Sequence, residues 1–374
     1  MNPRKTTFRI SVCVASLFLL FNLALNSQPQ LSRKEDQGDP VLGHRIAKGI
    51  VSDGRLWLRG TEVSRKGGPG GLVSLNLTDN SRAVYFQRGV VDIEKSGHDL
   101  WVLRQSSAER REYIVSVWKN GAFSDLAHFT SPDKDEPVVL LNIGASPAVL
   151  SRGTLRLLSG DHSDLRTIRL EGELRWGVQM NVASPKSAKA IYVGINRGEW
   201  GGGLQEVDIE TGVVSNIERR DTKDLCSGPL NSDCDPVTGV ISDPKNNDCV
   251  LAALGLVHLS ISEGRILRVC GNTVTPISDE PITGGIGGKM KMTEAFYGLA
   301  PAEGGGFWGL TWRALYRFSA DGKKQNEYAL PKLAPVSGIY ISRDLPGVIV
   351  VRTDVNWAVS TSGYTPLLVP LEGS

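Results

Sequence analysis

Short apolar segments recur along the chain at nearly regular intervals, with polar residues and turn formers between them. Neighbouring copies are 42 to 59 residues apart, counted between the central residues Trp57, Trp101, Val149, Tyr192, Leu251, Trp308 and Val350. A repeat of this length is a supersecondary unit that cannot bury both of its faces alone. The pattern therefore predicts seven units that pack against one another.

Within each unit, apolar and polar side chains alternate with a period of two, which is typical of β-strands. Turn formers such as Asn120-Gly121 and Asp321-Gly322 separate the strands. In the fifth unit we expect the third strand at residues 256–261 (LVHLSI) and its hairpin turn at Glu263-Gly264. This assignment places His258 away from the centre, where we expect a structural role.

The first strand of each unit carries Gly, Asp or Asn followed by a branched apolar residue. The seven pairs are Gly49-Ile50, Asp92-Ile93, Asn142-Ile143, Asn181-Val182, Gly239-Val240, Gly298-Leu299 and Gly338-Ile339. Small side chains suit a position where strands crowd toward a common axis. We therefore predict an all-β fold, a seven-bladed β-propeller of four-stranded antiparallel blades, with these positions nearest the axis.

Residues 1–27 have the features of a secretory signal peptide. Basic residues precede a 16-residue apolar run, and small and polar residues follow it. The run is shorter than the roughly 20 residues that a membrane-spanning helix needs, and the alternative is a retained membrane anchor. We expect a flexible lead-in at 28–42 and the propeller at 43–374, in a monomeric protein that is periplasmic or secreted.

Charge excludes some classes of partner. The chain has 42 Lys and Arg against 40 Asp and Glu, and loss of Arg4, Lys5 and Arg9 with the signal leaves 39 against 40. Such a balance gives no global attraction to nucleic acid or to an anionic membrane surface. We expect no nucleic-acid partner, and no membrane span in the mature chain unless the signal is retained.

Four cysteines remain in the mature chain: Cys226, Cys234, Cys249 and Cys270. An even, clustered set in an exported protein favours two disulfides, with a zinc site as the alternative. Cys226 and Cys234 share one loop, so we predict that they pair. The expected strands put Cys249 on the second strand and Cys270 on the fourth, about 9 to 10 Å apart, which excludes a bond between them.

One blade has a recognisable sequence. The segment GFWGLTWRALYRFSADGK, at 306–323, resembles the blade consensus of two-component-regulator and streptogramin-lyase-like propellers, and GRLWLRG and HDLWVLR echo its first half. The resemblance implies architecture, since unrelated functions occupy such rings. Its lyase branch would imply a His and Glu pair that handles a metal ion on one face. No local motif in this chain carries those residues.

Arginines recur at the expected ends of the second strands. In the usual layout these ends share one rim with the starts of the inner strands, which we call the top face. The arginines expected there are Arg59, Arg104, Arg152, Arg175, Arg197 and Arg352. Guanidinium groups bind carboxylates and phosphates, so this rim predicts a small anionic ligand or an acidic protein surface. The alternative is that they pair across blade boundaries with the carboxylates of Asp92, Asp235, Glu199 and Glu294.

The loop NRGEWGGG, residues 196–203, adds Glu199 and Trp200 to the same rim. Trp200 offers a stacking surface, or alternatively covers the neighbouring blade. A divalent cation, if one is bound, would be held by Asp92, Asn142, Asn181 and Glu199.

Two functions follow. The first is a non-catalytic, exported propeller that binds a ligand or partner on its top face. The second is an extracytoplasmic, metal-dependent lyase or hydrolase of the streptogramin-lyase or lactonase type. No GxSxG, HExxH or P-loop pattern supports a specific chemistry.

Overall fold

In this computed structural model the chain divides into two units, residues 1–37 and 38–374, and every described residue belongs to the second. The described residues are 41–42, 46–61, 69–107, 109, 111–132, 137–144, 146–158, 165–177, 179–224, 226–258, 261–282, 292–330, 336–342, 348–353 and 365–370. The predicted signal peptide and most of the lead-in lie outside them. None of the helical structure in these ranges is long and apolar enough to cross a membrane.

The regular structure is almost entirely antiparallel sheet, and the strands of each blade follow one another from the innermost to the outermost. Blades 1 and 2 share the long strand β4, whose first half pairs with β3 and whose second half pairs with β5. Their strands are β1 (Ile46–Ser52), β2 (Arg55–Thr61), β3 (Pro69–Asn76), β4 (Arg82–Ser96), β5 (Asp99–Ser107), β6 (Glu112–Lys119) and β7 (Ala122–Thr130).

Blades 3, 4 and 5 have four strands each. Blade 3 contains β8 (Pro137–Ile143), β9 (Ser146–Ser151), β10 (Thr154–Leu158) and β11 (Leu165–Arg169). Blade 4 contains β12 (Gln179–Ala183), β13 (Ala190–Asn196), the 3₁₀ turn η1 (Gly198–Trp200), β14 (Gly202–Asp208) and β15 (Val214–Ile217). Blade 5 contains β16 (Val237–Ser242), β17 (Val250–His258), β18 (Ile261–Cys270) and β19 (Thr273–Ser278).

The chain reaches blade 6 through a short ribbon of β20 (Pro281–Ile282) and β21 (Met292–Thr293). Blade 6 contains β22 (Gly298–Pro301), β23 (Phe307–Leu310), β24 (Ala314–Phe318) and β25 (Lys324–Ala329). Three strands are described in blade 7: β26 (Val336–Ser342), β27 (Val348–Thr353) and β28 (Thr365–Pro370).

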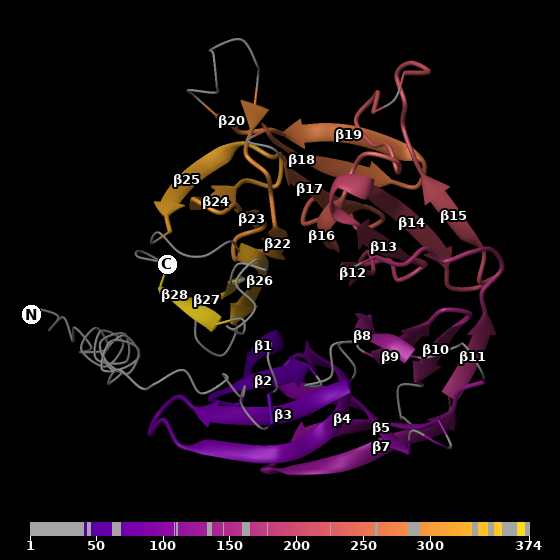
Figure 1. The fold of residues 1–374 in the computed structure, drawn as a ribbon, viewed down its shortest axis with the longest axis vertical. Coiled ribbons are helices and arrows are strands. Elements are labelled where there is room, and N and C mark those ends of the chain that lie inside the picture. The colour runs from indigo at the N-terminus through magenta and orange to yellow at the C-terminus, as the bar shows by residue number, and fades with distance from the viewer. Residues whose placement is uncertain are drawn as a thin grey trace, which may run out of the picture. The chain divides into compact units, whose positions relative to one another are not determined.

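The innermost strands close into a ring (Figure 1). In the order β1, β4, β8, β12, β16, β22 and β26 each contacts the next, and β26 contacts β1. This arrangement confirms the seven-bladed propeller, and all seven aligned Gly, Asp and Asn positions lie in these strands. Crowding explains the small residues: a Cβ atom on Gly239 would lie 2.8 Å from the backbone nitrogen of Leu299 on the neighbouring inner strand.

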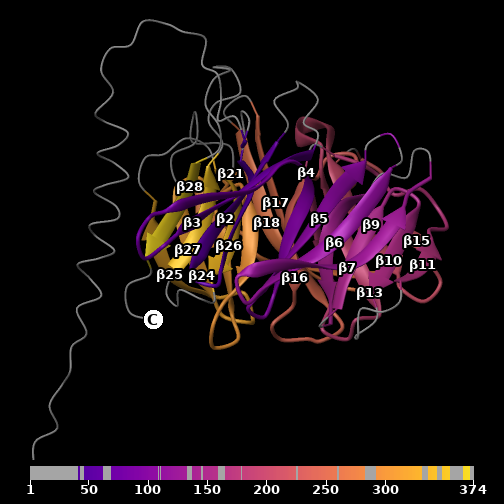
Figure 2. The same cartoon turned by 90° about the horizontal axis from the view of Figure 1, so that it is seen from below.

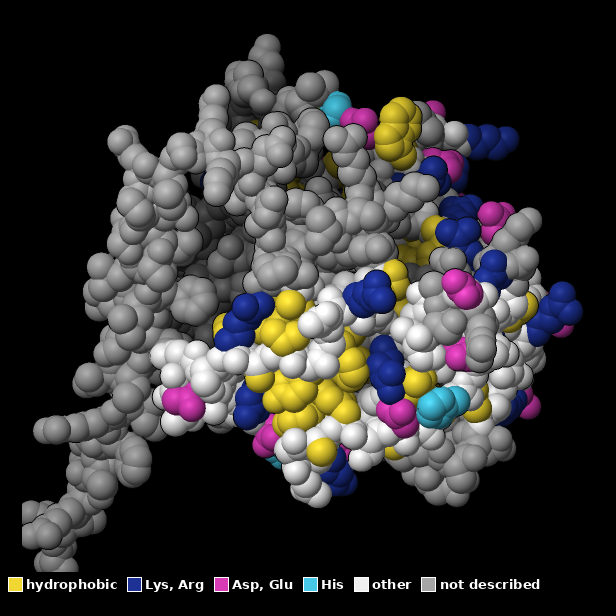
Figure 3. Space-filling model, turned by 60° about the horizontal axis from the view of Figure 1, so that its bottom comes forward, with side chains coloured by type: hydrophobic (Ala, Val, Ile, Leu, Met, Phe, Trp, Pro, Cys, Tyr) yellow, Lys and Arg dark blue, Asp and Glu magenta, His cyan; other side chains and the backbone are white. Residues whose placement is uncertain are grey.

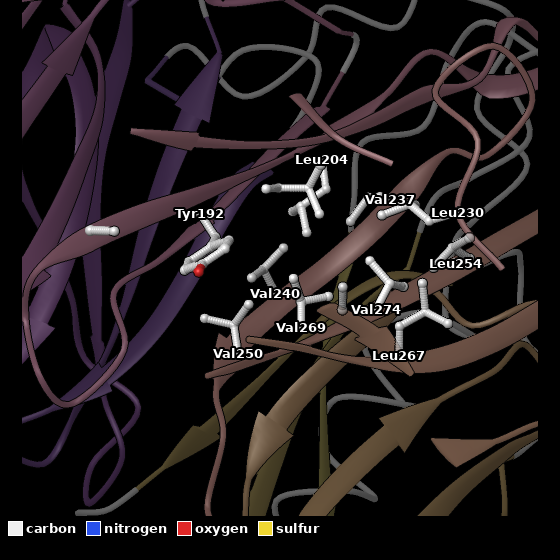
Figure 4. Close-up of a cluster of buried hydrophobic side chains, with 13 residues drawn as sticks. Tyr192, Leu204, Leu230, Val237, Val240, Val250, Leu254, Leu267, Val269 and Val274 are labelled. Atoms are coloured by element: carbon white, nitrogen blue, oxygen red, sulfur yellow. The ribbon is translucent and has the colours of Figure 1, made fainter. Parts of the chain in front are cut away.

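The hydrophobic cores lie between blades. Figure 4 shows one of them, in which Tyr192 and Leu204 of blade 4 face Val240, Val250 and Val269 of blade 5. Similar clusters fill the preceding boundaries and the boundary between blades 5 and 6. Full burial of one such aliphatic side chain contributes about 1.5 to 3 kcal/mol. Each blade is therefore stabilised mainly by its neighbours.

Polar bonds near the axis also join the blades. Asp92 of blade 2 accepts hydrogen bonds from Lys48 Nζ of blade 1 at 3.4 Å and from the backbone N–H of Leu140 of blade 3 at 2.9 Å. Burial alone would lower the pKa of Lys48, but the carboxylates of Asp92 and Glu94 outweigh burial and raise it. One buried carboxylate thus links three consecutive blades.

The predicted exclusion of a Cys249–Cys270 bond is wrong. The two cysteines form a disulfide with their Cα atoms 4.4 Å apart. Val250 pairs with Val269, so Cys249 and Cys270 face each other across adjacent strands, β17 and β18. The other predicted pair, Cys226–Cys234, is confirmed with a Cα separation of 5.3 Å.

The error arose from the position of the hairpin. Strand β17 continues to His258, and β18 begins at Ile261, so residues 256–261 are not a separate third strand. Gly264 lies inside β18 rather than in a turn. A Cβ atom there would lie 2.1 Å from the carbonyl oxygen of Glu294, so this glycine permits close packing against the next segment. As a result His258 ends a second strand, at the top face.

The surface has no dominant sign of charge in the view of Figure 3. Blue Lys and Arg side chains and magenta Asp and Glu side chains alternate there around an area of yellow hydrophobic side chains. This mixture agrees with the near balance of charges in the sequence. Charge-based recognition must therefore depend on local groups of residues.

Asp92→Ala is expected to lower the free energy of unfolding by about 1 to 3 kcal/mol, because the buried Leu140 N–H loses its acceptor and the partly buried Lys48 keeps only Glu94. Asp92→Asn keeps one acceptor oxygen and should lose less. Urea unfolding measures both. Glu210→Ala, at an exposed position in a turn, is the control and should change stability by less than about 0.5 kcal/mol. Equal effects of Asp92→Ala and Glu210→Ala would contradict the linking role.

The two disulfides should differ in their rate of reduction under native conditions. Cys226 is exposed, whereas Cys249 is fully buried, and a thiolate must reach a sulfur atom to attack it. Limiting dithiothreitol, followed by alkylation and peptide mass spectrometry, should label Cys226 and Cys234 first. Simultaneous labelling of all four cysteines would show that access does not control reduction.

Candidate functional site

The top face is the end at which second strands finish and inner strands begin, and blade 4 carries a structured turn there. Figure 2 shows the blades from the side, with the coiled turn η1 at the upper end. Arg197 N–H donates to the carbonyl of Gly201 at 2.9 Å, and Gly198 N–H donates to Asn196 Oδ1 at 2.8 Å. These bonds fix the turn while leaving Trp200 70% exposed. Trp200 therefore does not cover the neighbouring blade.

The glycines after Trp200 fit this turn against a second loop, residues 218–236, which we call the disulfide loop. Gly202 N–H donates to the carbonyl of Ser232, and Gly203 N–H donates to that of Asp235, both at 2.9 Å. A Cβ atom on Gly203, whose φ is +84°, would lie 2.7 Å from the Cβ of Ser232. Glycine here allows two protein loops to meet closely, rather than a ligand to approach the backbone.

Ion pairs hold the disulfide loop in place. Glu218 accepts a hydrogen bond from Ser232 Oγ and pairs with Arg220, which also binds Asp233 at 2.9 Å. Burial alone would raise the pKa of Glu218, but the bonds from Ser232 and Arg220 outweigh it and lower that pKa. The loop and the Trp200 turn thus form one bonded unit at the top of blade 4.

A side-chain bridge joins this unit to blade 5. Glu199 Oε2 lies 2.8 Å from His258 Nδ1, at the end of β17. Both side chains are about half exposed. The sequence pattern put Glu199 on the top face, but it missed His258 because of the displaced hairpin.

The predicted arginines fall into two groups. Arg59 Nε donates to the carbonyl of Val90 on the next blade at 3.2 Å, and Arg104 binds Asp125 through both carboxylate oxygens at 2.9 and 3.0 Å. Arg104 therefore points along its blade toward the outer strands. Arg352 belongs to β27, and its side chain lies outside the described ones.

The other three arginines, Arg152, Arg175 and Arg197, form what we call the arginine cluster. Arg152 lies over the ring of Trp176 at 5.1 Å, and Arg175 precedes that residue. A Cβ atom on Gly177 would lie 2.4 Å from the carbonyl oxygen of Asn196, which brings this segment against the start of the Trp200 turn. In the part of the chain that the structure describes, no carboxylate pairs with these three guanidinium groups.

The residues predicted as metal ligands make contacts within the ring. Asp92 is engaged as described above, Asn142 Nδ2 donates to Lys95 O at 2.6 Å, and Asn181 Nδ2 donates to Val237 O at 3.4 Å. Glu199 is paired with His258. Within the described ranges, no group of three or more His, Cys, Asp or Glu side chains is arranged to hold a metal ion.

Carboxylates predicted as partners of the arginine rim do form ion pairs, but with other cations. Asp235 pairs with Arg265 at 2.7 Å, and Glu294 pairs with Arg313. Burial raises the pKa of Asp235, while Arg265 acts in the opposite direction. These arginines lie on strands or turns whose neighbours in space could not be identified from the repeat alone.

No protein-family model and no curated protein sequence matches the chain. Solved structures with a similar fold include a chain of the Mitotic Checkpoint Complex, with 12% identity, a TM-score of 0.49, and coverage of 94% of this chain and 96% of that one. The β-propeller domain of the Trilobed protease from Pyrococcus furiosus has 10% identity, a TM-score of 0.49, and coverage of 89% and 94%. YCF48 from Cyanidioschyzon merolae has 10% identity, a TM-score of 0.48, and coverage of 84% and 94%.

Proposed function

We propose that this protein is an exported, non-catalytic propeller that binds an anionic ligand or an acidic protein surface on its top face. The observation that supports this proposal is the arginine cluster. Arg152, Arg175 and Arg197 have no carboxylate partner among the described residues, whereas Arg104, Arg265 and other arginines of the ring do. Guanidinium groups without a carboxylate partner, on neighbouring turns of one face, are suited to binding carboxylate or phosphate.

Aromatic side chains lie beside these charges. Trp176 already stacks under Arg152, which orients the guanidinium plane, and Trp200 presents an exposed ring on a fixed turn. Because the chain has nearly equal numbers of basic and acidic residues, attraction of an anion would be local. Its binding would weaken as salt is added.

Export accounts for the N-terminal sequence and for the disulfides. Residues 1–27 have the composition of a signal peptide, and the structure contains two disulfides, which form and persist in oxidising compartments. We place the mature protein in the periplasm or outside the cell, as a monomer.

We prefer binding to the catalytic alternative because of the contacts of the candidate ligands. A metal-dependent lyase or hydrolase would need oxygens of Asp92, Asn142, Asn181 and Glu199 to face a common ion. In the structure Asp92 accepts hydrogen bonds from Lys48 and from Leu140 N–H, and Glu199 is paired with His258. A cation would have to displace these partners.

The double variant Arg152→Ala/Arg197→Ala should bind anionic probes more weakly. Fluorescent poly-L-glutamate represents an acidic protein surface, and citrate represents a small anion. Loss of two charge-assisted contacts predicts about a ten- to hundredfold rise in the Kd of the preferred probe. Fluorescence anisotropy and calorimetry measure these values at low salt.

The matched control is Arg166→Ala/Arg169→Ala, which removes the same charge from β11, the outermost strand of blade 3. It should leave the Kd nearly unchanged. Thermal unfolding should show that both double variants keep the wild-type midpoint within a few degrees. Equal weakening by both pairs would mean that net charge, not the cluster, drives binding, and the proposal would fail.

A further inference from the structure

Exposed large hydrophobic side chains are concentrated on one part of the top face. Six such side chains are exposed among the described residues, and four of them lie on or next to the turns that join second and third strands in blades 4, 5 and 6. These four are Trp200 (70%), Val257 (38%), Ile261 (43%) and Trp312 (43%). We call them the apolar row. Scattered exposed hydrophobics are ordinary, but a group on successive turns of one face indicates an interaction surface.

The middle of the row is the β17–β18 hairpin, which extends past the last pair of β16 and β17. Cross-strand partners share a face of a hairpin. His258 pairs with Ile261 and Val257 pairs with Ser262, so Ile261 and Val257 lie on opposite faces. The hairpin therefore presents one apolar side chain toward blade 4 and one toward blade 6.

Side-chain contacts connect the hairpin to both tryptophan turns. On one side His258 binds Glu199, which precedes Trp200. On the other side Ser262 Oγ donates to the carbonyl of Thr293 at 2.8 Å. Glu294, the next residue, pairs with Arg313, which follows Trp312. The turns that carry the row are thus linked to one another over three blades.

Most charged side chains of the row bond to one another. Glu294 pairs with Arg313, Glu263 pairs with Arg265, which also pairs with Asp235, and Glu199 binds His258. A partner placed on the row therefore meets apolar side chains beside polar groups that already have bonds. The arginine cluster, for which the described residues provide no carboxylate partner, adjoins the row at the Trp200 end, because Arg197 begins the same turn.

From this arrangement we infer that the top face binds a protein partner through an extended segment that carries large apolar side chains next to acidic ones. The apolar side chains would lie on the row and the carboxylates on the arginine cluster. The inference rests on the proposed function and specifies the class of its partner. Trp200 lies where the row meets the arginine cluster, and tryptophan and arginine are enriched among the residues that dominate protein interfaces.

The composition of the row favours a polypeptide over a polysaccharide. A sugar chain needs hydrogen-bonding groups beside each stacking ring, but the polar groups nearest the row already bind one another. Val257 and Ile261 offer only aliphatic contact, which suits apolar side chains of a protein.

A random-peptide display library tests the inference on the purified, disulfide-bonded full chain. Selected peptides should be enriched in Asp or Glu together with large apolar residues. Their Kd should rise about tenfold or more on Val257→Ser/Ile261→Ser, since contacts near the centre of an interface carry most of its affinity. The matched control is Val84→Ser/Val213→Ser, which removes the two exposed hydrophobics outside the row and should leave the Kd unchanged.

Trp312→Ser removes another side chain of the row, outside the hairpin, and should also raise the Kd of the selected peptides. Thermal unfolding checks that each variant keeps its fold. The inference is overturned if no peptide is enriched, or if peptides bind the row variant and its control equally. It is also overturned if heparin binds and requires Val257 and Ile261, which would assign the row to a polysaccharide. Concentration-dependent dimers that are lost in the row variant, seen by sedimentation, would assign the row to a second copy of this chain.

Failure of the proposed function gives a different result. In that case Arg152→Ala/Arg197→Ala would leave poly-L-glutamate binding unchanged, while selected peptides would still depend on the apolar row. Loss of peptide binding in the row variant with normal poly-L-glutamate binding supports both statements.

Discussion

Each blade of this chain is a small twisted sheet with two apolar faces, and a neighbouring blade must cover each face before the sheet is stable. The hydrophobic clusters consequently lie at blade boundaries, as between Tyr192 on one side and Val250 on the other. Near the axis the same boundaries are joined by polar bonds, and Asp92 alone contacts groups from blades 1 and 3. Closure of the ring is therefore a cooperative property of the blades together, because removal of one boundary exposes the faces of two sheets.

Because contacts between blades close the ring, the turns of the top face contribute little to its stability in most blades. The inner and second strands set the positions of the turns, and the turns can differ in length without disturbing the boundaries. Blades 4 to 6 use this freedom most, since they carry η1, the disulfide loop, the extended β17–β18 hairpin and the β20–β21 ribbon. Ion pairs and backbone bonds connect these elements directly. Trp200, the most exposed of the described tryptophans, stands on a turn that is hydrogen-bonded to the disulfide loop.

The arginines of this protein have two kinds of surroundings. Where the side chain can reach a carboxylate, as Arg104 reaches Asp125, it stabilises its own blade. Arg152 has no carboxylate partner among the described residues, and its guanidinium lies over the ring of Trp176. The proposed binding function depends on this second group, and the apolar row would supply neighbouring apolar contacts.

The sequence by itself determined the number of blades, the strand that lies innermost in each, and the Cys226–Cys234 bond, because these follow from repeat length, alternation and loop size. It placed Glu199 and Trp200 on the top face for the same reason. Only the tertiary structure decided the Cys249–Cys270 bond and the position of His258. Both depend on where one hairpin turns, and Gly264, which resembles a turn residue, serves instead for contact with Glu294 in the next segment. The pairing of each arginine was likewise decided by neighbours from other blades, which no local pattern specifies.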